Sequence, residues 1–401
     1  MQFDNQQKSA IETAEVCRFA IVTGGAGTGK TTIIDEITKR VEKSGETVTL
    51  CAFAGKAAAR MREATKHPAS TIHRMLGYNG VGFNAGPLDD QVIVMDEASM
   101  VSSDLMAEIV QRKPKRLILV GDPAQLPPVG RGQPFHDLIR LRPAMVSELT
   151  TCYRATEAVF KAAAAIRQGC KPVLSDATTS EKWDIINTGD AGQTQAKLLE
   201  WIRAGVIDFE QDIILCPRNG ENGEQPGTVK GLNQAIVEIV GQDGNGRKTP
   251  NDFRPGDRVI NTKNLQPKDV WNGTTGTVHA VDIDGGVWVR VDIPVIDWGS
   301  TSDEKMPTYT DKVLFSKTER KSLELAYALT VHKSQGSQYR RVVFVALQRD
   351  SWSLLDRPLI YTAITRTQEQ CVVIGETGAF FAGIKNHKNK RTVLQEVAGC
   401  P

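Results

Sequence analysis

The sequence lacks several features that would indicate particular classes of protein. None of its apolar runs reaches the length that a membrane-spanning helix needs. Its seven cysteines are scattered, odd in number and without the C-x-x-C spacing of a zinc or redox site. Residues 1–7 lack the basic and apolar regions of a signal peptide. We therefore expect a soluble, intracellular protein with no membrane partner, whose cysteines are small core residues.

An excess of charge of either sign is also missing. The 49 Lys and Arg residues nearly balance the 47 Asp and Glu residues, and the formal net charge is +2. Composition therefore does not indicate nucleic-acid binding, and any basic groove must come from local arrangement. The sequence has no internal repeat and no low-complexity tract, and its 401 residues allow two or three domains.

One glycine-rich stretch, GGAGTGKT at 24–31, organises the rest of the chain. It fits the phosphate-loop pattern G-x-x-x-x-G-K-[ST], and it lies between the apolar run 19–22 and a helical pattern, as that loop must. Its amides would face an anion, Lys30 would reach the β- and γ-phosphates of ATP, and the Thr31 hydroxyl would help to hold Mg²⁺. The alternative is a glycine-rich turn that happens to precede a helix. The predicted nucleotide-binding residues here are Gly24, Gly25, Ala26, Gly27, Thr28, Gly29, Lys30, Thr31 and Thr32.

The order of apolar runs predicts an α/β fold. Within residues 1 to about 145, strands at 48–52, 91–95 and 116–120 each end in polar or glycine-rich residues, where open parallel sheets bind ligands. Their continuous apolar character predicts a sheet covered on both faces. A second α/β set begins near residue 149, and its predicted elements are a helix at 159–166 and strands at 213–216, 342–346 and 371–374.

Residues 250–318 differ in character from the two α/β sets. Short β-branched and aromatic runs alternate with turn residues over this segment. The pattern predicts a small all-β barrel that is inserted into the second set.

Three polar side chains follow the third and fourth predicted strands. Asp96 would hold Mg²⁺ through its water shell, and Glu97 would orient or deprotonate the attacking water. The alternative is an Asp-Glu pair that caps the next helix. Gln125 is placed to touch the γ-phosphate, and its alternative is a proline-rich surface turn.

Together these motifs resemble superfamily 1 helicases, most closely the RecD-like and Dda-like branch. The resemblance covers nearly the whole chain in order and spacing. Its blocks are Gln7, GGAGTGKT (24–31), AFAGKAAARM (52–61), STIHR (70–74), DEAS (96–99), GDPAQLPPV (121–129), Tyr153-Arg154, LTVHKSQG (329–336) and YTAITRT (361–367).

The resemblance implies two tandem RecA-like P-loop NTPase domains with ATP between them. The first would span residues 1–148, the second 149–249 and 319–401, and an SH3-like β-barrel 250–318. Gln7 resembles the residue that reads the adenine edge, and Gly336 also lies in a nucleotide-binding motif. Arg154 and Arg366 resemble the two arginines that the second domain presents to the γ-phosphate, although either alone would also suit a surface ion pair.

A second implied site grips a single DNA strand through phosphates and base faces. The branch also has a short β-hairpin wedge after STIHR, for which residues 77–90 are the candidate, with a plain loop as the alternative. For His73 and His332 the alternative to a DNA contact is a hydrogen-bonded histidine at the start of a helix. The predicted nucleic-acid contacts are Phe53, Gly55, Lys56, Thr71, His73, Tyr78, Phe83, Thr330, His332 and Lys333.

Two positions depart from the family pattern. Phe53-Ala54-Gly55 stands where the branch usually has Pro-Thr-Gly, so a phosphate-contacting hydroxyl is missing and Phe53 would either stack on a base or join the core. Gln338 stands where a Glu often follows the Gln-Gly pair, which leaves the usual ribose or adenine contact there open.

The resemblance implies an ATP- and Mg²⁺-dependent DNA helicase and single-stranded DNA translocase with 5′ to 3′ polarity. The alternatives are a protein-displacing or RNA-directed translocase, or a non-hydrolysing nucleic-acid-binding subunit. The expected partners are single-stranded DNA and single-strand/duplex junctions, with a single-strand-binding protein or replication and recombination machinery as further candidates. We expect a monomer in the cytoplasm of a bacterial cell or phage-infected host.

Overall fold

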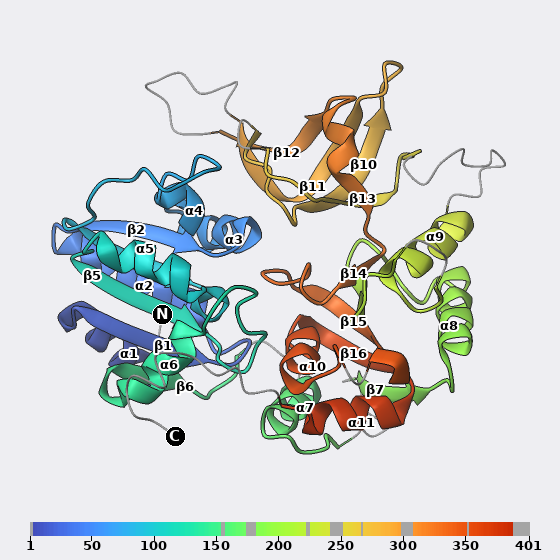
Figure 1. The fold of residues 1–401 in the computed structure, drawn as a ribbon, viewed down its shortest axis with the longest axis horizontal. Helices are drawn as coiled ribbons and strands as arrows, with labels where there is room; N and C mark the ends of the chain where they lie inside the picture. Colours follow the sequence, from blue (N-terminus) through green and yellow to red (C-terminus); the bar gives the residue numbers. More distant parts are fainter. Residues whose placement is uncertain are drawn as a thin grey trace. The chain divides into compact units, whose positions relative to one another are not determined.

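The structure is a computed structural model that describes residues 3–153, 157–173, 182–221, 225–240, 252–265, 268–297, 308–350 and 353–387. The chain divides into two compact units, one within Met1–Ala155 and one within Thr156–His387. Each unit is described by itself, with the element labels of Figure 1. Arg154, one of the predicted site residues, lies outside the described residues.

The first unit is built on a six-stranded parallel sheet in the order β3-β2-β4-β5-β1-β6. Its four predicted strands are confirmed, and two strands that were not predicted, β3 beside β2 and β6 beside β1, form the two edges of the sheet. The strands are β1 (Phe19–Gly24), β2 (Thr47–Ala52), β3 (Ala69–Thr71), β4 (Gln91–Asp96), β5 (Arg116–Gly121) and β6 (Val146–Leu149). The helices are α1 (Asn5–Val16), α2 (Lys30–Lys43), α3 (Gly55–Thr65), α4 (Ile72–Met75), α5 (Ser103–Gln111) and α6 (Pro134–Leu141).

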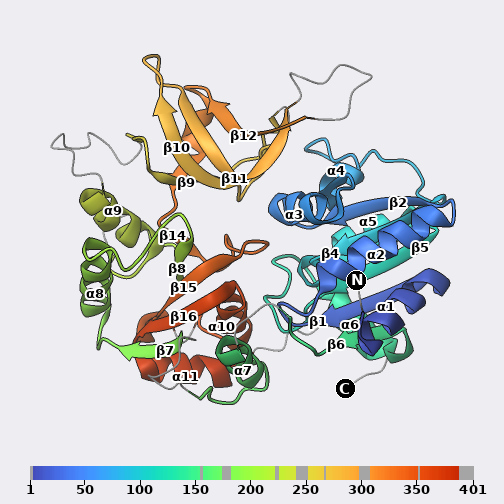
Figure 2. The same cartoon turned by 180° about the vertical axis from the view of Figure 1, so that it is seen from behind.

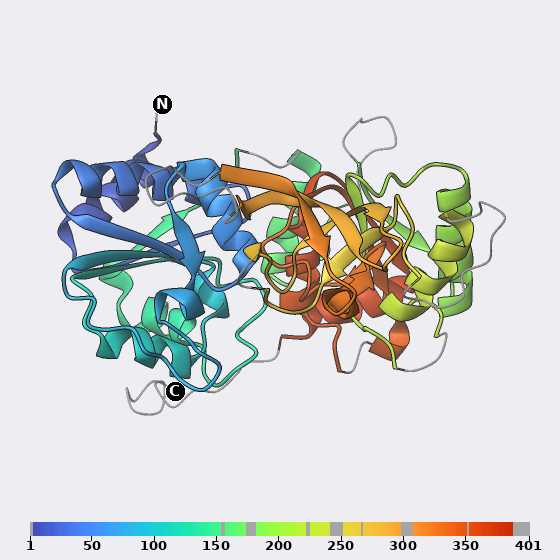
Figure 3. The ribbon, with the colours of Figure 1, turned by 90° about the horizontal axis from the view of Figure 1, so that it is seen from above.

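Helices cover this sheet on both faces, as the continuous apolar strands predict. On one face, α1, α2 and α3 pack against side chains such as Val22 and Val94. On the other, α5 and α6 pack against the alternate residues of the same strands, such as Ile21 and Ile93. Figure 3 shows the blue α1 and α2 on one side of the sheet and the teal α5 and α6 on the other. The sheet is therefore held rigidly between two apolar layers.

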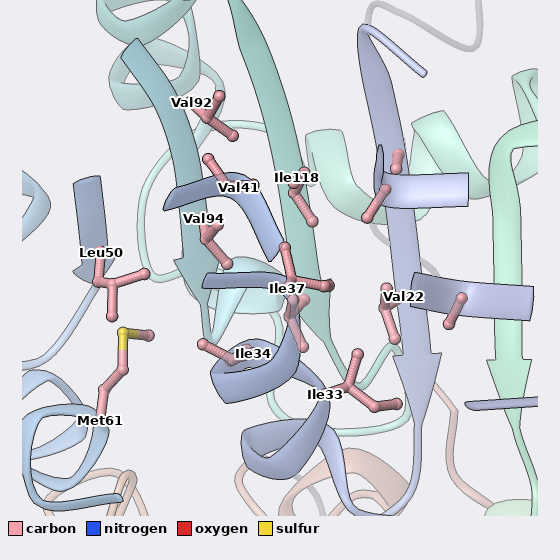
Figure 4. Packing of buried hydrophobic residues seen from close by; sticks show 14 of the residues in the cluster. Val22, Ile33, Ile34, Ile37, Val41, Leu50, Met61, Val92, Val94 and Ile118 are labelled. Carbon is pink, nitrogen blue, oxygen red and sulfur yellow. The ribbon is translucent and has the colours of Figure 1, made fainter. Parts of the chain in front are cut away.

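The packing of α2 fixes the segment that precedes it. Ile33, Ile34 and Ile37 of α2 have no exposed surface, and they meet Val94 and Ile118 of the sheet (Figure 4). Burying an isoleucine side chain contributes about 1.5–3 kcal/mol. These contacts fix where α2 begins, and so they fix the loop that joins it to β1.

The second unit contains a five-stranded parallel sheet in the order β14-β8-β15-β16-β7. Its three predicted strands and predicted helix are confirmed. The α8 and α9 helices pack on one face of the sheet, whereas α7, α10 and α11 gather on the other side (Figure 2). The elements are α7 (Glu157–Arg167), β7 (Lys182–Asn187), α8 (Ala191–Arg203), β8 (Asp212–Cys216), α9 (Val229–Val240), β14 (Ala328–Thr330), β15 (Tyr339–Ala346), α10 (Arg357–Ile364), β16 (Thr367–Gly375) and α11 (Thr377–Lys385).

The same unit carries a separate antiparallel sheet in the order β12-β11-β10-β9-β13. The predicted all-β segment 250–318 contains its first four strands, and the sheet continues to β13 beyond that boundary. The strands are β9 (Arg258–Asn261), β10 (Thr275–Val281), β11 (Val287–Asp297), β12 (Thr308–Phe315) and β13 (Leu323–Leu325). Tyr327, which follows β13, donates from its hydroxyl to Asp257 Oδ1 at 2.8 Å. This bond ties the antiparallel sheet to the chain that enters β14.

The cysteines within the described residues range from buried through half-buried to exposed. Cys51, Cys216 and Cys371 are buried, and burial raises the pKa of each thiol, so these three are core residues as predicted. Cys170 is exposed, so the same interpretation is wrong for it. Among the helices of the described residues, none combines the length and the apolar character that crossing a membrane requires.

Candidate functional site

The phosphate loop joins β1 to α2 with the backbone conformation that its glycines permit. Gly27 and Gly29 have φ angles of 78° and 85°, in the left-handed region where a side chain is strained. A Cβ atom on Gly24 would lie 2.5 Å from Thr28 Oγ1. Gly29 is the N-cap of α2 and has no side chain to bond the first amides of that helix. The loop therefore offers those amides to an anion at the positive end of α2.

The Lys30 side chain curls back over the loop. Its ammonium group donates to the carbonyl oxygens of Gly24 at 2.7 Å and Gly25 at 2.8 Å. The Thr28 hydroxyl also donates to Gly25 at 3.0 Å. Thr31 and Thr32 follow in the first turn of α2 and are partly exposed. The structure thus places the cation of the motif directly against the loop it is predicted to serve.

Asp96 and Glu97 lie where β4 ends, at the same edge of the sheet as the phosphate loop, because β4 and β1 both run parallel to β5. Desolvation by the surrounding protein raises the pKa of Asp96 to about 6, and repulsion from Glu97 adds to it. A hydrogen bond from the Glu97 amide at 2.8 Å and the charges of Lys30 and Arg60 oppose this rise. The carboxylate of Asp96 therefore interacts electrostatically with the phosphate-loop lysine.

The backbone of Glu97 is in an unfavourable conformation. Its φ of 52° lies in the left-handed region, which costs a residue with a side chain roughly 1–2 kcal/mol. Glu97 precedes a short 3₁₀ helix, Ala98–Met100, but within the described chain its side chain makes no capping hydrogen bond to that helix. Helix α5 is capped instead by Ser102. The alternative interpretation of the Asp-Glu pair as a helix cap is therefore wrong for Glu97.

Gln125 lies beyond the end of β5. It is 5% exposed, so the alternative of a surface turn does not describe it. Its Nε2 donates to Asp122 Oδ2 at 3.4 Å, and Asp122 Oδ1 accepts from the Ala124 amide at 3.0 Å. Asp122 is completely buried, so this carboxylate holds Gln125 at the loop edge of the sheet. Sequence reasoning missed Asp122, although a polar residue directly after a buried strand is the signal that identified Asp96.

Gln7 lies at the phosphate loop together with two residues that sequence reasoning did not assign. A Cβ atom on Gly29 would lie 2.7 Å from Gln7 Nε2 and 3.9 Å from Tyr153 Cδ2. Asp4 accepts from the Gln7 amide at 2.7 Å and from the Tyr153 hydroxyl at 2.5 Å. The Tyr153 hydroxyl is the main reason that the pKa of Asp4 lies below its usual value. The D-x-x-Q spacing of a capping box was the signal that could have identified Asp4.

The segment that carries Tyr153 is bonded to the phosphate loop through its backbone as well. The Tyr153 amide donates to the Gly27 carbonyl at 2.8 Å. The Thr150 amide donates to Gln6 Oε1 at 2.9 Å. Residues 150–153 are therefore anchored to both α1 and the loop.

We expect Asp4→Ala to destabilise the first unit modestly. The substitution removes the N-cap of α1, which costs about 1 kcal/mol, and the exposed bond to Tyr153 adds little. Thermal unfolding would measure the change. Asp4→Asn is the matched control because Asn also caps helices and should retain most of the stability. A loss in the Asn variant as large as that in the Ala variant would contradict the capping explanation.

Four predicted nucleic-acid contacts form one aromatic cluster in the first unit, comprising Phe53, His73, Tyr78 and Phe83. Its ring centroids are 6.2 Å apart for Phe53–His73, 5.6 Å for His73–Tyr78, 6.0 Å for His73–Phe83 and 5.1 Å for Tyr78–Phe83. Burial lowers the pKa of His73, which favours the neutral form of its ring. Tyr78 is 41% exposed, whereas Phe53 and Phe83 also pack against the core. The cluster presents π-faces of the kind on which bases stack.

Three other predicted contacts of the first unit are buried. Gly55 and Lys56 begin α3, and Lys56 is 8% exposed. Thr71 is 6% exposed and caps α4 by accepting from the Arg74 amide at 3.2 Å. Their contact with nucleic acid stays a prediction.

The predicted contacts of the second unit lie at and after the end of β14. The Thr330 hydroxyl accepts from the Lys333 amide at 3.2 Å, and the Lys333 ammonium pairs with Glu324 at 2.8 Å. His332 has an exposed surface. Desolvation by the neighbouring protein nevertheless lowers its pKa, and the negative charge of Asp356 opposes this with a smaller effect. Gly336 has a φ of 74°, so the turn at this position needs a glycine.

Arg366 is buried within the second unit, with 4% of its surface exposed. Its Nε donates to the Thr362 carbonyl at 3.2 Å, and its Nη1 donates to the Ser337 carbonyl at 3.4 Å. These bonds link the end of α10 to Ser337, directly after the segment 329–336. The predicted contact with the γ-phosphate stays a prediction.

Comparison with known proteins agrees with this architecture. Residues 2–197 match the family model described as an AAA domain, and residues 325–374 match a UvrD-like helicase C-terminal domain. A Bacteroides Pif1 helicase structure in complex with ADP-AlF3 and ssDNA superposes with a TM-score of 0.58 at 19% identity, over 100% of this chain and 96% of that one. This likeness shows the fold.

Two curated relatives match over nearly the whole chain. The ATP-dependent RecD2 DNA helicase of Deinococcus radiodurans is 32% identical over 98% of this chain, which spans 52% of that protein. The RecBCD enzyme subunit RecD of Mycobacterium tuberculosis is 30% identical, over 99% of this chain and 74% of that subunit. The chain thus spans between half and three quarters of the length of these relatives. With two parallel-sheet units and the helicase motifs in order, it belongs to the RecD-like branch of the superfamily 1 helicases.

Proposed function

We propose that this chain is an ATP-dependent DNA helicase and single-stranded DNA translocase that moves 5′ to 3′. One observation carries the proposal. The phosphate loop, the Asp96–Glu97 pair and Gln125 lie at the same edge of one parallel sheet, in a chain of the RecD-like family. The names of the relatives, an ATP-dependent DNA helicase and RecD subunits, support ATP-driven work on DNA.

The nucleotide would be held by residues 24–32 and Gln7, with Lys30 bonded to its phosphates. Thr31 and Asp96 would hold Mg²⁺, since hydroxyl and carboxylate oxygens are ligands that this ion prefers. Bound Mg²⁺ neutralises the charge that develops on the phosphates. Glu97 would orient and deprotonate water, and Gln125 would contact the γ-phosphate. We further propose that Arg154 and Arg366 stabilise the transition-state charge, as the family resemblance implies.

The DNA strand would contact the aromatic cluster of the first unit and Thr330, His332 and Lys333 of the second. Stacking on aromatic rings tolerates any sequence, because every base has a π-face. We propose that residues 77–90 supply the wedge that opens the duplex, and that the antiparallel sheet is the SH3-like insert of this branch. We also propose that its partners include a single-strand-binding protein or recombination machinery. Its proposed location is the cytoplasm.

Strand displacement on duplexes with either a 5′ or a 3′ overhang tests this function. We expect ATP- and Mg²⁺-dependent unwinding of the 5′-tailed substrate and little unwinding of the 3′-tailed one. ATP hydrolysis should rise strongly when single-stranded DNA is added. Unwinding of only the 3′-tailed substrate would overturn the polarity, and hydrolysis without any response to DNA or RNA would overturn the motor.

A further inference from the structure

A small hairpin projects between α4 and β4. Residues 77–85 form it, and Tyr78 and Phe83 are its paired residues. The Asn79 amide donates to the Gly82 carbonyl at 3.1 Å near the tip, and the Ala85 amide donates to the Leu76 carbonyl at 3.0 Å at the base. A two-stranded hairpin of this length is marginally stable in water, so it needs support from elsewhere in the protein.

The tip of the hairpin is ordered by its own side chains. Asn79 Oδ1 accepts from the amides of Val81 at 3.0 Å and Gly82 at 2.9 Å. The Tyr78 hydroxyl donates to the Gly80 carbonyl at 3.1 Å. Val81 is 95% exposed at the end of this turn. The tip therefore offers an apolar side chain on a defined turn, which is what a wedge between base pairs requires.

The support at the base comes from Arg112, which lies at the C-terminal end of α5. Its Nε donates to the Ala85 carbonyl at 3.2 Å, and its Nη2 donates to the Phe83 carbonyl at 3.1 Å. Its own carbonyl accepts from the Leu88 amide at 2.8 Å. One residue thus bonds the returning strand of the hairpin at two points and the chain that follows it at a third, Leu88.

Arg112 is itself held in place. Its Nη1 pairs with Glu108 Oε2 at 2.8 Å, and its side chain is only 13% exposed. Helix α5 is fixed to the sheet by the buried Leu105, Met106 and Ile109. The guanidinium group is planar and can bond two carbonyls and a carboxylate at once, which a lysine ammonium cannot reproduce in the same geometry.

We infer that Arg112 is a positioning residue for duplex opening, which keeps the hairpin at a fixed angle to the first unit. The inference rests on the proposed function of residues 77–90 as a wedge. Arg112 itself need not touch DNA or nucleotide. A loosened hairpin should leave ATP-driven movement on single-stranded DNA intact and should reduce only the coupling of that movement to strand separation.

Arg112→Ala tests the inference in the full chain. We expect single-stranded-DNA-stimulated ATP hydrolysis within about twofold of wild type and unwinding slowed by about tenfold, because charge-assisted hydrogen bonds are lost at one site. Arg112→Lys should be intermediate. Hydrogen exchange at the amides of residues 79–85 should accelerate by a similar factor, whereas amides of β1, β4 and β5 should keep their protection.

Glu108→Gln is the matched control. It removes the charge partner of Arg112 but leaves both hairpin carbonyls bonded, so its unwinding rate should stay within about twofold of wild type. Wild-type unwinding by Arg112→Ala overturns the inference. An equal loss of hydrolysis and unwinding also overturns it, because that result indicates general damage.

Deleting Gly80–Gly82 at the hairpin tip separates this inference from the proposed function, because it leaves Tyr78, Phe83 and both carbonyls that Arg112 bonds in the chain. We expect the deletion to spare DNA-stimulated hydrolysis and to slow unwinding by roughly tenfold or more, as expected when a wedge is lost. Unchanged unwinding would overturn the wedge and, with it, the role of Arg112. Slowed unwinding in the deletion beside normal unwinding in Arg112→Ala would leave the wedge in place and reject only the anchor.

Discussion

Replacing Lys30 with alanine is expected to abolish ATP hydrolysis while leaving single-stranded DNA binding mostly intact. Lys30 is the only cation of the G-K-T motif, and its ammonium group already lies against the loop carbonyls of Gly24 and Gly25. Removing a preorganised charge at a phosphoryl-transfer site costs about 10²–10³-fold in rate, and weaker nucleotide binding adds to the loss. The proposed DNA contacts involve other residues, such as Tyr78 and His332, so DNA binding should persist.

Lys39→Ala is a suitable control for this variant. Lys39 lies further along α2, is exposed, and makes an i, i+4 pair with Asp35 that contributes little. Its hydrolysis rate should match wild type. Steady-state hydrolysis with saturating single-stranded DNA, together with fluorescence anisotropy of a labelled oligonucleotide, measures both properties. If Lys30→Ala lost DNA binding and hydrolysis to the same extent, the two sites would not be separate.

The phosphate-loop edge could be predicted from the sequence because its signals are local. A continuous apolar strand that ends in glycines or carboxylates is visible within about ten residues, and Lys30, Asp96 and Gln125 were all identified in this way. Because the strands of such a sheet are parallel, their C-terminal ends lie at the same edge, and no long-range contact has to be predicted to bring these residues together. The same locality explains why β1, β4 and β5 were placed nearly to the residue.

The contacts that sequence reasoning missed join residues far apart in the chain. Tyr153 and Asp4 are separated by 149 positions, and Arg112 lies 27 positions from Ala85. Neither pairing has a periodic pattern, because side-chain bonds to distant backbone groups depend on how the helices pack. Burial was also hard to predict for short polar residues. Thr71, for example, is predicted from its motif to contact DNA, and the structure shows that it is buried and caps a helix.

The second large effect is expected for Glu97→Gln, which should retain ATP binding but reduce hydrolysis by about 10²–10⁴-fold. The amide keeps the size of the side chain and removes its capacity to accept a proton from water, and a positioned general base contributes about that factor. Binding of a fluorescent ATP analogue in the presence of Mg²⁺ should be near wild type. This combination distinguishes Glu97 from Lys30, whose loss should weaken nucleotide binding as well.

Stability measurements on the same variant show whether Glu97 is kept for function at a structural cost. The raised pKa of Asp96 means that its ionisation opposes folding, so stability is lost as the pH rises through about 6. Repulsion from Glu97 contributes to that loss, so Glu97→Gln should be at least as stable as wild type at pH 7.5 and should lower the pKa of Asp96. Glu97→Gly, which also relieves the left-handed φ, should be inactive without being less stable. A marked loss of stability in both variants would identify Glu97 as a structural residue and remove it from the catalytic machinery.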